Sequence, residues 1–77
     1  MIKVPVNFKR TEDAVEFVKI ANEYPFQMDL ASGSRIVDAK SLLGTIAISQ
    51  AEGLSLRIYS NPSPSTEQLL NAMQNYL

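Results

Sequence analysis

The chain has 77 residues, enough for one small domain, and its hydrophobic fraction of 45% is ordinary for a globular protein and argues against disorder. Seven Lys and Arg against eight Asp and Glu give a net charge of −1, and the basic residues are scattered, which argues against a nucleic-acid footprint. The absence of cysteine and histidine excludes thiol chemistry and removes the commonest general base and metal ligand.

The first third of the chain predicts a strand followed by a helix. Apolar and polar residues alternate over 2–9, which indicates a strand with one buried face. Pro5 places that strand at a sheet edge, because proline cannot donate to a ladder. Thr11 is predicted to cap the helix, and Pro25 to end it. The apolar residues of this helix recur at helical spacing and form one face: Ala14, Phe17, Val18 and Ala21.

The middle of the chain predicts a hairpin and then a short helix. Residues 26–31 alternate as a second strand, 32–34 form a turn, and 35–39 are a third strand. Ser41 is predicted to cap a helix that reaches Ile48.

The last part predicts a fourth strand over 54–59, and then a helix that begins with a capping box of Ser65 and Gln68 and runs to Leu77. The resulting order, β-α-β-β-α-β-α, predicts a single α+β domain over residues 1–77. An antiparallel sheet with helices on one face is the natural two-layer arrangement for it.

This element order resembles that of the HPr family, the small phosphocarrier proteins of the bacterial sugar phosphotransferase system. The sharpest match is the segment Ala-Lys-Ser-Leu-Leu-Gly over residues 39–44, followed by Ile46. The resemblance covers nearly the whole chain. It implies an open-faced sandwich, in which a four-stranded antiparallel sheet of order 1-4-2-3 is covered on one face by three helices. That order places the first strand at an edge, which agrees with Pro5.

The family's carrier loop, Gly-x-His-x-Arg-Pro-Ala, falls on residues 8–14, and only Ala14 is retained. Arg10 stands at the phosphate-accepting histidine, Glu12 at the phosphate-binding arginine and Asp13 at the proline. A guanidinium is no nucleophile at neutral pH, and two carboxylates at the helix start would repel a phosphoryl group. The chain is therefore more similar to regulatory relatives that lack the histidine and keep the serine.

Ser41 has two compatible interpretations. As an N-cap it would contribute about 1 kcal/mol to helix stability. The resemblance also implies regulatory phosphorylation of Ser41 by a serine kinase, as in family members from Gram-positive bacteria. Five residues are candidates for partner binding: Lys40, Leu42, Leu43, Ile46 and Arg10. The alternative for the apolar members is core packing, and for Arg10 it is a solvated charge balanced by nearby carboxylates.

We expect a non-catalytic HPr-like protein that acts as a regulatory or protein-binding module and uses no cofactor or metal. The resemblance implies protein partners, such as phosphotransferase enzymes, a serine kinase or a transcriptional regulator. Two alternatives remain open: a phosphocarrier-type component of sugar phosphotransfer, and an interaction domain that kept only the fold. Because no long apolar segment or signal-peptide core is found, we expect a cytoplasmic protein without membrane insertion. The resemblance implies a bacterial source.

Overall fold

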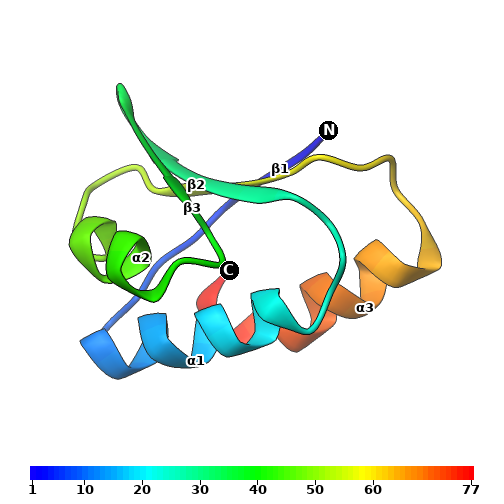
Figure 1. Cartoon of the computed structure of the whole chain (residues 1–77), viewed down its shortest axis with the longest axis horizontal. Helices are drawn as coiled ribbons and strands as arrows, with labels where there is room; N and C mark the ends of the chain where they lie inside the picture. Colours follow the sequence, from blue (N-terminus) through cyan, green and yellow to red (C-terminus); the bar gives the residue numbers. More distant parts are fainter.

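The computed structural model covers residues 1–77 and consists of a sheet with helices on one side (Figure 1). The strands are β1 (Ile2–Pro5), β2 (Met28–Ser32), β3 (Arg35–Asp38) and β4 (Ser55–Ile58). The helices are α1 (Thr11–Asn22), α2 (Leu42–Ile48) and α3 (Pro64–Ala72), and a 3-10 turn, η1 (Gln74–Tyr76), follows. All strand pairs are antiparallel and the sheet order is β1-β4-β2-β3, which confirms the predicted α+β sandwich and its order 1-4-2-3. No helix is long and apolar enough to cross a membrane.

The edge position of Pro5 is confirmed, because β1 pairs only with β4. The ladder ends at Pro5, earlier than the sequence alternation suggests, but Val6 and Phe8 continue to bury their side chains. The Val6 N–H still donates to the Leu54 carbonyl at 2.9 Å, so the chain stays close to β4 beyond the regular strand.

The hydrophobic core lies between the sheet and the helices. The four apolar residues predicted on the first helix are all buried on α1. Phe8 packs edge-on against Phe17, with ring centroids 5.1 Å apart, and Tyr76 lies 6.0 Å from Phe8. Phe8 stands where the carrier loop of the HPr family has its glycine. In this chain, Phe8 belongs to the core that joins the β1–α1 loop to the end of the chain.

The start of α1 differs from the prediction. Arg10, and not Thr11, is the N-cap residue. The Asp13 side chain folds back and accepts hydrogen bonds from the N–H groups of Lys9 at 3.0 Å and Arg10 at 3.2 Å. The carboxylate at the third helical position thus anchors the two residues before the helix, and the Asp13 N–H donates to the Arg10 carbonyl at 3.1 Å, so that Arg10 takes the cap position and Thr11 is the first helical residue.

The start of α3 also differs, since the predicted capping box of Ser65 and Gln68 is wrong. Ser63 is the N-cap, and its Oγ accepts a hydrogen bond from the Thr66 N–H at 3.2 Å. The Thr66 Oγ1 accepts one from the Ser63 N–H at 2.8 Å. Pro64 occupies the first helical position, where its missing N–H costs nothing and its fixed φ suits a helix. At the other end, Leu77 lies beyond the helix and is exposed.

Candidate functional site

The N-terminus of α2 confirms the predicted cap. The Ser41 Oγ accepts a hydrogen bond from the Gly44 N–H at 3.1 Å. Asp38, at the end of β3, holds the preceding turn: its Oδ1 accepts from the Lys40 N–H at 2.9 Å, and its carbonyl accepts from the Ser41 N–H at 3.0 Å. Ser41 is thus positioned by the strand before it and by the helix after it.

Close packing at this helix start favours glycine at position 44. A Cβ at position 44 would lie 3.2 Å from the Ser41 Oγ and 3.3 Å from the Val37 Cβ, distances that few real contacts reach. The glycine therefore lets the first turn of α2 approach β3 while the Ser41 hydroxyl keeps its hydrogen bond.

The apolar residues of α2 divide between the core and the solvent. Ile48 is completely buried and Ile46 is half-buried against the core. Leu42 is 44% exposed and Leu43 83% exposed, the largest exposed fraction of any large hydrophobic residue in the chain. We call Ser41, Leu42, Leu43 and Ile46 the α2 patch. Within it, two exposed leucines directly follow a half-exposed serine.

Lys40 precedes the α2 patch, but its ammonium group is engaged elsewhere. The Lys40 Nζ donates to the Tyr24 carbonyl at 2.6 Å, just beyond the end of α1. The Asn22 side-chain amide donates to the Lys40 carbonyl at 3.1 Å. Lys40 therefore joins the end of α1 to the start of α2, and its charge does not lie free beside the Ser41 hydroxyl.

Arg10, Glu12 and Asp13, the residues at the carrier-loop positions, do not form an anion-binding site. The Arg10 Nε lies 3.8 Å from the Glu12 Oε2, and the two side chains are 74% and 73% exposed, so their attraction is weak. The Asp13 carboxylate lies in the first turn of α1 and accepts from the N–H groups of Lys9 and Arg10, just before the helix. The positive end of this helix is therefore neutralised by the chain's own carboxylate.

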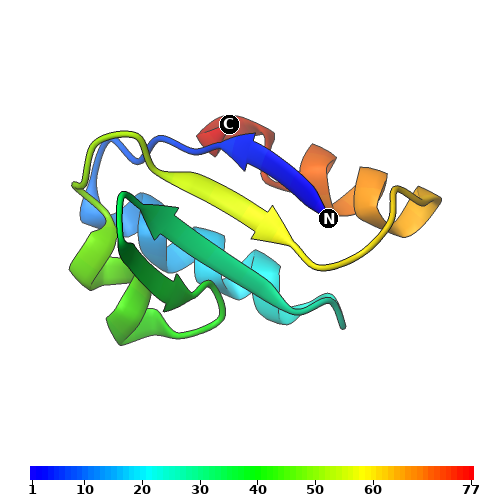
Figure 2. The same ribbon diagram turned by 90° about the horizontal axis from the view of Figure 1, so that it is seen from above.

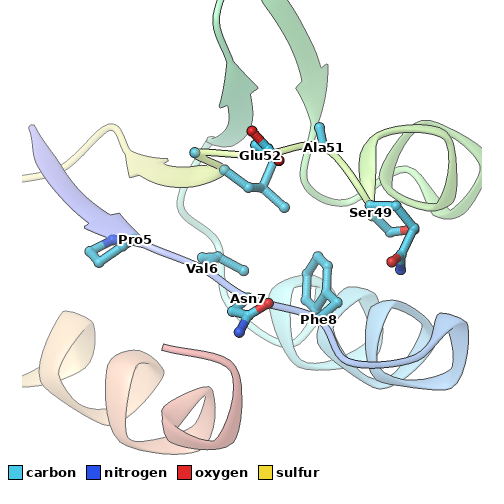
Figure 3. A pocket seen from close by; sticks show the side chains of 10 residues that line it. Pro5, Val6, Asn7, Phe8, Ser49, Ala51 and Glu52 are labelled. Carbon is cyan, nitrogen blue, oxygen red and sulfur yellow. The ribbon is translucent and has the colours of Figure 1, made fainter.

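A surface depression of about 380 Å³ lies between the segment that follows β1 and the connection from α2 to β4 (Figure 3). Its walls include Val6, Phe8 and Leu54 as apolar residues, and Glu52 is its only acidic or basic side chain. Neither Arg10 nor Ser41 lines it. The structure therefore does not gather the predicted site residues into one pocket, and leaves the α2 patch as an exposed surface.

A polar cluster lies on the face of the sheet that points away from the helices, and the sequence analysis did not predict it. The Asp29 Oδ2 accepts hydrogen bonds from the Arg57 guanidinium at 2.9 Å and from the Tyr59 hydroxyl. The hydrogen bond to Asp29 is the main reason that the pKa of Tyr59 is raised above its ordinary value of 10.0, and desolvation adds to the shift. Asp29 and Arg57 occupy outward positions in the alternating patterns of β2 and β4, and Tyr59 directly follows β4. The contact among them depends on the pairing register of two strands far apart in the sequence, which the alternation does not specify.

Comparisons with known proteins agree with this architecture. No family model matches the chain, and no curated protein sequence matches it. HPr-C-His from Thermoanaerobacter tengcongensis superimposes with a TM-score of 0.73 at 21% identity, over 97% of this chain and 89% of that protein. Crh, a catabolite repression protein of Bacillus subtilis whose crystals contain an intertwined, domain-swapped dimer, gives a TM-score of 0.64 at 20% identity, over 97% and 88%. These similarities show that the chain has the HPr fold.

Proposed function

We propose that the chain is a non-catalytic, HPr-like regulatory protein that binds protein partners through the α2 patch, with Arg10 at the margin of the contact. The observation that carries the proposal is the exposure of Leu42 and Leu43 directly after Ser41. Two adjacent exposed leucines form a small apolar surface, and apolar surface on a helix is a common feature of protein contacts.

The composition of the β1–α1 loop supports binding rather than phosphate transfer. Arg10 offers no nucleophile at the position of the carrier histidine. Asp13 already binds the backbone N–H groups of Lys9 and Arg10, and Glu12 adds a second carboxylate to the first turn. A phosphoryl group placed there would meet two negative charges where a carrier needs donors.

Ser41 is proposed as the point of regulation. Its side chain is half-exposed, and its oxygen accepts a single backbone hydrogen bond. Phosphorylation would place about two negative charges beside Leu42 and Leu43, and would change partner binding more than folding. Candidate partners are phosphotransferase enzymes, a serine kinase and a transcriptional regulator. Both HPr-C-His and Crh, a catabolite repression protein, share the fold, so the preference for the regulatory members of this group rests on Arg10 at the position of the carrier histidine.

An affinity capture from the source cells tests the binding surface. Immobilised wild-type protein should retain a partner that the Leu43→Asp variant loses, because a charge at the most exposed leucine disrupts an apolar contact. Leu77→Asp is the matched control, since Leu77 is also exposed but lies at the end of the chain, outside the α2 patch. Equal retention by wild type and Leu43→Asp would contradict the proposal.

Two phosphorylation assays separate the regulator from a carrier. With phosphoenolpyruvate and the first enzyme of the phosphotransferase system, the protein should gain no acid-labile phosphate; stoichiometric labelling would establish a carrier instead. An HPr-type serine kinase should add one phosphate, detected by mass spectrometry. Ser41→Ala should abolish this addition, whereas Ser63→Ala, which removes another helix cap, should retain it.

A further inference from the structure

The face of the sheet opposite the helices is open. In Figure 2, no helix lies in front of the strands. The antiparallel register aligns the outward side chains into rows that run across the sheet, perpendicular to the strands. One row is charged and contains, from β1 to β3, Lys3, Arg57, Asp29 and Asp38. Its order of charges is therefore two positive and then two negative.

Only the inner pair of this row is ion-paired within the chain; the Asp38 carboxylate accepts one backbone hydrogen bond, from the Lys40 N–H, but has no cation beside it. Arg57 and Asp29 form an ion pair at 2.9 Å. Lys3 is aligned with Arg57, and Asp38 with Asp29, so each outer residue has a like charge beside it, which is unfavourable in a sheet. Neither Lys3 nor Asp38 has an ion-pair partner in the chain.

The neighbouring row suits close contact between sheets. It contains Pro5, Ser55, Ala31 and Ile36, in the order from β1 to β3. The two central residues are small, and the two outer residues are apolar and exposed, with Ile36 56% exposed.

We propose that a second copy of this chain packs face to face on the open sheet, around a two-fold axis parallel to the strands and midway between β4 and β2. This axis reverses the strand order of the second copy. Lys3 then faces Asp38 of the partner subunit, Arg57 faces Asp29 of the partner subunit, and Pro5 faces Ile36 of the partner subunit. A two-fold axis across the strands would bring like charges together, so the charge row selects one orientation. Sheets that pack in this aligned way cross at about −30°.

The contact is expected to be weak and reversible. The face seen in Figure 2 extends no more than 30 × 18 Å, whereas stable interfaces bury about 800 Å² per partner. The helices lie on the other side of the sheet, so this dimer leaves the α2 patch free and presents two copies of it. It goes beyond the proposed function, and it would allow one dimer to engage a two-fold partner at both patches.

Sedimentation equilibrium from micromolar to millimolar concentration tests the dimer. We expect reversible dimerisation that weakens as salt is raised. Lys3→Glu should raise the dissociation constant about tenfold, and Asp38→Asn, which keeps the oxygen that accepts from Lys40, should also raise it. The charge-swapped double variant Lys3→Glu/Asp38→Lys should restore affinity. Reversing an exposed ion pair on α1, with Glu16→Lys and Lys19→Glu, is the control and should change nothing.

A second measurement keeps the test independent of variant folding. In amide NMR spectra of the wild type, dilution should shift resonances of the strands and leave those of α2 unchanged. A chain that stays monomeric throughout the range would overturn the proposal. So would a dimer that is insensitive to Lys3→Glu and Asp38→Asn, which would point to strand exchange, or one whose dilution shifts map to the α2 patch.

Discussion

At the scale of single residues, Ser41 has a structural role whatever regulation acts on it. Its Oγ satisfies the Gly44 N–H at the start of a helix of only seven residues. A helix this short owes its stability to caps and packing more than to its own hydrogen bonds. The same oxygen would receive a phosphate, so cap and modification share one atom.

Substitution of Ser41 should separate these two roles. Ser41→Ala should lower the free energy of unfolding by about 0.5–2 kcal/mol, because the Gly44 N–H loses its acceptor. Ser41→Asp should recover part of that loss, because a carboxylate also accepts this hydrogen bond and suits the positive end of the helix. Denaturant unfolding of the three proteins measures the difference. Equal stability of Ser41→Ala and wild type would show that α2 begins elsewhere.

Tyr59 should give the protein a pH dependence in the alkaline range. The hydrogen bond to Asp29 favours the protonated hydroxyl, so the pKa of Tyr59 in the folded protein lies above the 10.0 of the unfolded chain. This contribution to stability is therefore complete below pH 10 and is lost as the pH rises through the raised value. Asp29→Asn should move the pKa of Tyr59 back toward 10, as measured by phenolate absorbance, with Tyr59→Phe identifying the Tyr59 signal. An unchanged titration in Asp29→Asn would assign the shift to burial alone.

At the scale of helices and strands, the sequence predicted which elements form and which of their faces are buried better than it predicted where each element begins. Period-two and helical spacing identified every strand and helix, because burial of one face leaves a direct pattern in the chain. The starts of α1 and α3 were misplaced, because both candidate caps were chosen by residue type. Asp13 reaches back past Thr11, and Pro64 moves the cap from Ser65 to Ser63. Which residue becomes the N-cap depends on local backbone geometry, which the spacing of apolar residues does not determine.

The corrected start of α3 gives a paired prediction. Ser63→Ala should lower the free energy of unfolding by about 1 kcal/mol, because the Thr66 N–H loses its acceptor. Ser65→Ala should have little effect, because Ser65 is an exposed first-turn residue without a capping bond. Thermal or denaturant unfolding of both variants decides between the two caps. A larger loss from Ser65→Ala would restore the original assignment.

At the scale of the whole molecule, the order of the strands in the sheet was predicted from the resemblance to the HPr family and not from the spacing of apolar residues. The sheet order joins β1 to β4 and β4 to β2, segments far apart in the chain, and the alternation of apolar residues does not specify their neighbours. The Asp29, Arg57 and Tyr59 cluster was missed for the same reason. A short helix cannot bury all of its apolar residues, so some exposure on α2 could be expected, but only the structure shows that Leu42 and Leu43 are the exposed ones.

The contributions of the fold and of the carrier-loop residues (8–14) to phosphate transfer can be tested separately. The chain shares its fold with HPr-C-His over nearly its whole length, but of the carrier loop it retains only Ala14. If the loop alone prevents phosphate transfer, the triple variant Arg10→His/Glu12→Arg/Asp13→Pro should restore it. The variant supplies the nucleophile and a cation, and it removes the carboxylate that accepts from the N–H groups of residues 9 and 10, just before α1. Phe8 is kept, because it is buried against Phe17.

With phosphoenolpyruvate and the first enzyme of the phosphotransferase system, this triple variant should acquire acid-labile phosphate, and the wild type should not. Adding Leu43→Asp should abolish the gain, because the enzyme would dock on the α2 patch before it reaches the loop. Adding Leu77→Asp, at an exposed leucine outside that patch, should leave the gain intact. A folded triple variant that accepts no phosphate would mean that more than these loop residues separates the chain from a carrier. Phosphate transfer that survives Leu43→Asp would mean that docking does not depend on the α2 patch.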